Sequence, residues 1–347
     1  MKIKISERLI IISALIIMAV IYYGSRYYNR IYTPVILPEA ETDYHLFVPS
    51  GTDLNGFIKL ISKEALVADS SGFRWLAERK NLQNHLNSGH YLLKNNMVNN
   101  DLINLIRSGE QEPVKIVFHN LRSIEQLAST VSSHIEVDSI TLVSFLKDES
   151  NISASGWSSQ TIPALFIPNS YEIYWNTSAQ AFFDRMEREY KSFWNNERLK
   201  KAEELGLSPV EVSTLASIVD EETYRDDEMP MIAAVYLNRL KKRYRLQADP
   251  TIKFAKGNFE MNRVLKADLQ IDSPYNTYRH YGLPPGPISI PSIASIDAVL
   301  SPNKQGYLYF CAKEDFSGYH NFAKTLVEHN RNARKYQNAL NKRRIYN

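Results

Sequence analysis

The chain has 347 residues, of which 44% are hydrophobic and 23% are charged. This length suggests about two domains, and the composition excludes a disordered chain, a collagen-like chain and a membrane protein with many spans. The formal net charge of +3 is too small to indicate nucleic-acid binding. Cys311 is the single cysteine, which excludes an intramolecular disulfide and a cysteine-based metal site.

An apolar run extends from residue 9 to residue 23 and follows several basic residues. We predict a short cytoplasmic N-terminus (residues 1–7) and a transmembrane anchor (residues 8–25), since a membrane span needs about 20 residues. A cleaved signal peptide is the alternative, but the bulky residues 21–23 stand where a cleavage site needs small ones. The leading basic residues favour an N-terminus inside the cell and a body outside it.

Residues 26–42 are polar and contain Pro34 and Pro38, so we predict a linker there. A small α+β domain is predicted at residues 43–118. Its strands are expected near residues 44–48, 89–93 and 114–118, with short amphipathic helices between them.

The rest of the chain, residues 119–347, is predicted to form a second, mixed α+β domain. Helical patterns occur in four segments, namely 121–150, 178–204, 229–242 and 323 onward. Residues 245–320 are rich in Pro, Gly, Tyr and Asn and show few helical patterns.

A further helix is predicted to begin at Ser208. Serine at the N-cap, proline at the first helical position and glutamate at the third form a strong start signature. The apolar residues that follow fall on one stripe of the helix, namely Val212, Leu215, Ile218 and Val219.

The acidic triplet at the end of this helix divides between two faces. Glu222 falls near the centre of the apolar stripe, whereas Asp220 and Glu221 project to its sides. A solvated helix face explains Asp220 and Glu221, but a carboxylate on the core-facing stripe is costly to ionise unless it is paired. Glu222 is therefore either part of a buried ion pair, with Arg239 or Arg245 as its partner, or an acid with a raised pKa.

An acid of this kind suits the cleavage of glycosidic bonds. The leaving oxygen must be protonated, and a desolvated glutamate can hold a proton near neutral pH. Hydrolysis usually adds a second carboxylate as nucleophile or base, and Asp249 is the best candidate in this region.

The helix segment Leu215–Thr223 reads Leu-Ala-Ser-Ile-Val-Asp-Glu-Glu-Thr. Other unusual motifs follow it in order, namely Val235–Leu240, Arg245–Thr251, Ser273–Tyr278, Gly282–Ile288, Tyr307–Phe310, His320–Phe322 and Asn330. With these motifs, which cover about residues 165–335, the chain resembles the endolytic murein transglycosylases, the MltG or YceG-like family.

The resemblance implies a LysM-like domain at residues 43–118 and a YceG-like catalytic domain at residues 119–347, with the catalytic glutamate on a helix. It implies cleavage of the MurNAc-β-1,4-GlcNAc bond within peptidoglycan strands, which leaves 1,6-anhydro-MurNAc ends. This cleavage is expected to terminate the elongation of nascent strands. In this family the catalytic acid is the second glutamate of a Glu-Lys-Glu stretch, and the resemblance places it at Glu222. Asp220 and Glu221 depart from the other two positions.

No metal or other cofactor is expected, since the eight histidines lack His-x-x-x-His spacing. The expected substrate-binding residues are Gln247, Asp249, Tyr275, Asn276, Thr277 and Tyr278. Residues 275–278 could instead form a structural turn, and Asp249 could only cap one. His320 is expected to be structural, and Arg239 to be a salt-bridge partner.

The expected partners are peptidoglycan glycan strands, the membrane and cell-wall synthesis enzymes. The expected location is the bacterial inner membrane, with a single span and the catalytic part on the periplasmic side. Two other functions stay open: a glycoside hydrolase that uses Glu222 and Asp249, and an inactive peptidoglycan-binding scaffold.

Overall fold

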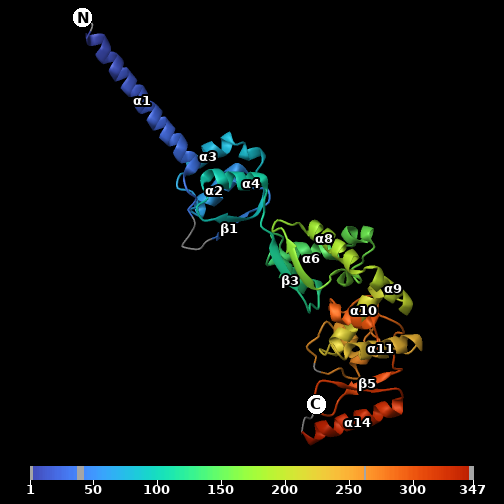
Figure 1. The fold of residues 1–347 in the computed structure, drawn as a ribbon. Coiled ribbons are helices and arrows are strands. Elements are labelled where there is room, and N and C mark those ends of the chain that lie inside the picture. Colours follow the sequence, from blue (N-terminus) through green and yellow to red (C-terminus); the bar gives the residue numbers. More distant parts are fainter. Residues whose placement is uncertain (1–2, 37–42, 262, 344–347) are drawn as a thin grey trace. The chain divides into compact units, whose positions relative to one another are not determined.

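A computed structural model describes residues 3–36, 43–261 and 263–343 (Figure 1). The chain divides into two compact units. Unit 1 comprises Met1–Lys115, His134–Glu136 and Glu172–Thr177, and unit 2 comprises Ile116–Ser133, Val137–Tyr171 and Ser178–Asn347. The sequence pattern did not reveal the two short returns of the chain to unit 1.

The first element is helix α1 (Ile3–Tyr32), which is 30 residues long. Its segment Arg8–Tyr32 is long and apolar enough to cross a membrane, and none of its most apolar window is buried. The helix continues past residue 25, where the anchor was predicted to end. It stops just before Pro34, because the residue that precedes a proline is disfavoured in helical conformation.

The predicted linker differs from the structure over residues 26–36. Residues 26–32 are helical, Pro34 forms a β-bridge with Val98, and Val35 is only 6% exposed in the core of unit 1. The chain therefore enters the small domain sooner than its polar composition suggested. Residues 37–42 of the predicted linker lie outside the described residues.

Unit 1 contains a two-stranded antiparallel sheet in which β1 (Asp43–Val48) pairs with β2 (Gly89–Lys94). Its helices are α2 (Leu54–Lys63), α3 (Ser70–Arg79), η1 (Leu82–Asn84) and α4 (Asn99–Ser108). Asp53 caps α2 by accepting a hydrogen bond from the Gly56 amide. The core gathers large side chains from these elements, including Leu46, Phe57, Phe73, Tyr91 and Leu102.

Strands β3 (Val114–Phe118) and β4 (Asn169–Ile173) form a second two-stranded sheet. The helical elements of the first part of unit 2 are α5 (Ile124–Ser132), α6 (Ser139–Lys147), α7 (Glu149–Ile152), η2 (Ser153–Ser155), η3 (Ile162–Leu165), α8 (Ala179–Phe193) and α9 (Asn196–Leu205). The single helix predicted for 178–204 is thus two helices. Trp194 leaves the helical conformation, and the Asn195 side chain caps α9 by accepting from the Arg198 amide.

Helix α10 (Pro209–Glu222) lies at the centre of unit 2 and packs against α11 (Met229–Lys241) and α13 (Ile293–Leu300). The predicted start is confirmed: the Ser208 hydroxyl accepts from the Glu211 amide, and the Glu211 carboxylate accepts from the Ser208 amide. Residues 212–219 are all buried, so the helix is covered on every side rather than along one stripe.

The segment 245–320 holds more helix than its composition predicts, namely α12 (Asp249–Ala255), η4 (Asp268–Gln270) and α13. Strands β5 (Tyr309–Ala312) and β6 (His320–Ala323) pair antiparallel, and α14 (Leu326–Lys342) packs against both. Figure 1 shows α10, α11, β5 and α14 in the same part of the molecule. These elements position the site described next.

Candidate active site

Glu222 is the last residue of α10, and its nearest polar partner is a tyrosine of α11. The Tyr236 hydroxyl donates a hydrogen bond of 2.5 Å to Glu222 Oε1. Burial raises the pKa of Glu222 to about 7, with the Tyr236 hydrogen bond acting in the opposite direction and the Asp249 charge adding to the rise. This carboxyl can therefore hold and release a proton near neutral pH.

Glu222 opens into a cavity of about 310 Å³. The wall combines charged, polar and aromatic groups, namely Glu222, Tyr236, Arg239, Leu246, Gln247, Asp249, Tyr278, Phe310 and His329. These side chains come from α10, α11, the 246–249 segment, the loop around 278, β5 and α14. The predicted residues Gln247, Asp249 and Tyr278 are thus brought together with Glu222.

Arg239 fixes one wall of this cavity through two backbone carbonyls. Its guanidinium donates to Leu246 O at 2.6 Å and to Leu308 O at 2.7 Å. It thereby ties the 246–249 segment to the residue that precedes β5. Gln247, next to Leu246, has a φ of +52°, a left-handed conformation that is uncommon for a residue with a side chain.

Asp249 and Tyr278 are joined across the cavity by a hydrogen bond of 2.5 Å from the Tyr278 hydroxyl to Asp249 Oδ1. Burial, and then the Asp249 carboxylate, raise the pKa of Tyr278 well above its usual value. The phenol consequently stays protonated and acts as a donor. Asp249 is the first residue of α12 and is not only a turn cap.

The other three predicted binding residues have structural contacts and do not line this cavity. Tyr275 packs its ring against Phe254, with centroids 4.5 Å apart. The Asn276 amide donates to the carbonyls of residues 269 and 271, and its oxygen accepts from the Tyr278 amide. The Thr277 hydroxyl accepts from the amide of residue 248. The turn formed by these residues positions the Tyr278 side chain in the cavity wall.

Glu222 forms no ion pair with Arg239 or Arg245 in the described part of the chain. Arg239 donates to carbonyl oxygens rather than to this carboxylate. Arg245 lies over the ring of Tyr281, at 4.7 Å from its centroid. Glu222 is thus a half-buried acid bonded to the neutral phenol of Tyr236, without an arginine partner among the described residues.

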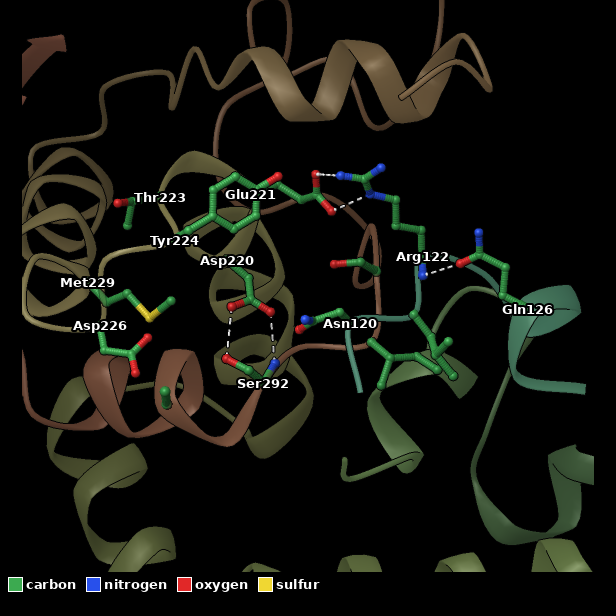
Figure 2. A pocket seen from close by; sticks show the side chains of 14 residues that line it. Asn120, Arg122, Gln126, Asp220, Glu221, Thr223, Tyr224, Asp226, Met229 and Ser292 are labelled. Carbon is green, nitrogen blue, oxygen red and sulfur yellow. Dashed lines mark hydrogen bonds and ion pairs between the residues drawn. The ribbon is translucent and has the colours of Figure 1, made fainter. Parts of the chain in front are cut away.

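The prediction that Asp220 and Glu221 form a solvated helix face is wrong. Asp220 accepts hydrogen bonds from the amide and the hydroxyl of Ser292, at 2.9 and 2.8 Å (Figure 2). Glu221 forms a two-point ion pair with Arg122, at 2.9 and 3.2 Å (Figure 2). The helical periodicity could not predict these contacts, because both partners come from segments far away in the sequence.

Sequence reasoning missed Tyr236 and His329 as members of the site. Tyr236 stands inside the motif Val235–Leu240, but nothing in one sequence shows that it reaches Glu222. His329 lies on α14, and its buried Nδ1 has no hydrogen-bond partner among the described residues. Burial, and then Arg239, lower the pKa of His329, so its ring is neutral at pH 7.

His320 is structural, as predicted. Its amide and its ring Nδ1 each lie 2.7 Å from a carboxylate oxygen of the buried Glu228. Within the residues that the structure describes, no group of three His, Cys, Asp or Glu side chains is placed to hold a metal ion.

A protonatable carboxyl, a neutral phenol bonded to it and a polar cavity around both define an enzyme site of the general acid–base class. The chain belongs to the YceG-like family, whose sequence profile matches residues 46–335. The family resemblance predicted from the motifs is thereby confirmed.

The relatives agree with this assignment. The chain is 28% identical over 338 residues to the endolytic murein transglycosylase of Bacillus subtilis (strain 168), with 92% of each chain covered. It is 27% identical over 367 residues to that of Streptococcus pneumoniae serotype 2, with 95% of this chain and 65% of the relative covered. A 2.6 Å crystal structure of a YceG-like protein from Listeria monocytogenes superposes with a TM-score of 0.55 and 26% identity, covering 84% of this chain and 99% of that one.

Proposed function

We propose that this protein is a membrane-anchored endolytic lytic transglycosylase of peptidoglycan. The observation that carries the proposal is Glu222, a carboxyl whose pKa of about 7 leaves it able both to give and to take a proton. The relatives from Bacillus subtilis and Streptococcus pneumoniae are endolytic murein transglycosylases, which supports the same substrate. The bond cut is the MurNAc-β-1,4-GlcNAc link within a glycan strand, and the cut terminates the elongation of nascent strands.

The chemistry needs one carboxyl acting twice. Protonated Glu222 gives its proton to the glycosidic oxygen while the bond from that oxygen to the anomeric carbon of MurNAc breaks. The resulting carboxylate then takes the proton of the 6-hydroxyl of the same sugar as O6 bonds to the anomeric carbon. The products are a free 4-hydroxyl and a 1,6-anhydro end, so no water is consumed and Glu222 regains its starting state.

The groups around Glu222 fit supporting roles in this reaction. Tyr236 holds one carboxyl oxygen, which leaves the other free to face the substrate. Gln247, Asp249 and Tyr278 line the same cavity and provide donors and acceptors for the sugar hydroxyls. A negative Asp249 near the anomeric carbon would also stabilise an oxocarbenium-like transition state.

The same Asp249 supports a second candidate function, hydrolysis with two carboxylates. Asp249 lines the cavity together with Glu222, where it could activate a water molecule. The experiment that separates the two functions is digestion of purified peptidoglycan by the full-length protein in detergent, with mass analysis of the fragment ends. Anhydro ends support the transglycosylase, reducing ends support the hydrolase, and absence of cleavage supports the inactive scaffold.

For the N-terminus we propose a single span, with residues 1–7 in the cytoplasm and the rest on the periplasmic side of the inner membrane. The length and apolar character of α1 support the span. The order β1, α2, α3, β2 in unit 1 supports a LysM-like domain. Cell-wall synthesis enzymes are the proposed protein partners, since a cut in a nascent strand must be made where strands are produced.

A further inference from the structure

Beside the end of α10 lies a second, larger pocket of about 660 Å³, which we call the acidic pocket (Figure 2). Its polar lining residues are Asn120, Arg122, Gln126, Asp220, Glu221, Thr223, Tyr224, Asp226, Ser289 and Ser292. None of the steps proposed for Glu222 uses this pocket.

The acidic pocket has an excess of negative charge. Three carboxylates line it, those of Asp220, Glu221 and Asp226, against the one guanidinium of Arg122. The two-point ion pair in Figure 2 commits Arg122 to Glu221. Among the described residues, Asp220 and Asp226 have no ion-pair partner. Burial foremost, and the charges of Glu221 and Asp226 to a smaller extent, raise the pKa of Asp220.

A buried hydroxyl in the same pocket also lacks a partner. Ser289 is only 5% exposed, and its Oγ has no hydrogen-bond partner among the described residues. An unpaired buried hydroxyl is costly, so its presence in a pocket wall points to a ligand group that pairs with it. Both a hydroxyl and a carboxylate accept hydrogen bonds, and a donor-only cation with several N–H groups fits both.

The acidic pocket lies next to the surroundings of the proposed catalytic carboxyl. Thr223 and Tyr224 line it and also line a cavity of about 420 Å³ that includes Glu222. Tyr224 is 87% exposed, so its ring can contact a ligand that reaches both spaces. A chain bound at Glu222 can therefore extend a substituent into the acidic pocket.

We propose that the acidic pocket binds the free side-chain amine of a diamino acid in the peptide stem of the glycan strand that is being cut. This inference rests on the proposed function. The stem is attached to MurNAc, the sugar cleaved at Glu222, and its ammonium group donates hydrogen bonds to Asp220, Asp226 and Ser289. Cross-linking acylates this amine and removes its charge, so the pocket selects strands whose stems are not cross-linked.

The test measures strand binding separately from cleavage. Soluble un-cross-linked strands with free amines, and the same strands after chemical N-acetylation, are titrated into the full-length Glu222→Gln protein in detergent. We expect about two- to fivefold weaker binding of the acetylated strands, the range for a partly exposed charge pair. The ratio of the two dissociation constants, acetylated over free-amine strands, should fall most of the way to one in the double variant Glu222→Gln, Asp226→Asn. The control Glu222→Gln, Asp227→Asn removes a neighbouring exposed charge that does not line the pocket, and it should keep the ratio.

Equal binding of both strand types by Glu222→Gln, or an unchanged ratio in the Asp226 variant, would overturn the inference. Neither result bears on the proposed function, which depends on the fragment ends that the wild-type protein makes from the free-amine strands. A wild-type protein that makes no anhydro ends while the binding ratio persists would overturn the transglycosylase and leave an amine-selective binding pocket.

Discussion

The Tyr236 hydroxyl donates a 2.5 Å hydrogen bond to Glu222 Oε1, and this bond joins the end of α10 to the middle of α11. Burial, and then the Glu222 charge, keep the pKa of Tyr236 well above its usual value, so the phenol is always the donor. The bond fixes the direction of the carboxyl and favours its ionised form. Tyr236 therefore tunes the pKa of the proposed catalytic acid as well as its position.

We expect Tyr236→Phe to raise the pKa of Glu222, because the hydrogen bond that favours the carboxylate is lost. Since the first step needs the protonated acid, kcat/KM falls as pH rises through this pKa, and in the variant that fall moves to higher pH. The rate on the plateau should drop about tenfold, since one positioned hydrogen bond is lost. A pH–rate profile of anhydro-end formation measures both effects.

The matched control for this variant is Tyr281→Phe. Tyr281 is 66% exposed, lies beneath Arg245 and does not line the cavity around Glu222. We expect it to keep the wild-type profile. A Tyr236→Phe profile that loses rate without moving along the pH axis would show that Tyr236 only packs at the site.

Glu222→Gln keeps the size of the side chain but can neither give nor take a proton. We expect the formation of anhydro ends to fall at least about 100-fold, the usual contribution of a general acid. Circular dichroism should remain that of the wild type, and Glu203→Gln, an exposed change on α9, should keep full activity. Cleavage by Glu222→Gln at the wild-type rate would remove this residue from the mechanism.

The site could be predicted from sequence only where local rules apply. The start of α10 followed from the Ser208 capping box, the apolar stripe singled out Glu222, and the family resemblance then matched its catalytic acid to the same residue. The apolar stripe was a weaker guide than it looked, because residues 212–219 are buried on every side and the helix has no polar face over this stretch. Asp220 and Glu221 could not be placed, because Ser292 and Arg122 come from segments 72 and 99 residues away.

The turn at residues 275–278 shows the same limit at the level of single side chains. The sequence gives no reason to assign different roles to its four residues. In the structure, Asn276 and Thr277 form hydrogen bonds with backbone groups, while the Tyr278 hydroxyl donates to Asp249. Helix α12 was missed because seven residues give too little periodicity to detect, and α13 because Pro, Gly and Tyr dominate the segment around it. Packing in unit 2, rather than intrinsic preference, decides these elements.

The raised pKa of Glu222 also predicts a dependence of stability on pH. The folded protein holds this carboxyl with a pKa of about 7, against 4.5 for the free group, so the unfolded chain ionises first. The contribution of protonated Glu222 to the free energy of unfolding is fully present at low pH. It is lost as pH rises from about 4.5 through about 7. Glu222→Gln never ionises, so its stability relative to the wild type should increase across this range, by at most about 3 kcal/mol. Melting temperatures near pH 5 and near pH 8 measure the change, and a constant difference between the proteins would contradict it.

Gly286 shows that the Gly282–Ile288 motif has a packing role. A Cβ at this position would stand 1.9 Å from the backbone carbonyl oxygen of Gln160, which cannot move aside as a side chain can. We expect Gly286→Ala to lower the free energy of unfolding by more than about 2 kcal/mol, because overpacking displaces the loop. Gly282 is the matched control: it has a φ of +85° and open space around it, so Gly282→Ala should cost only about 1 kcal/mol of strain. Urea denaturation of both variants measures the difference, and equal costs would mean that contact with Gln160 does not constrain the loop.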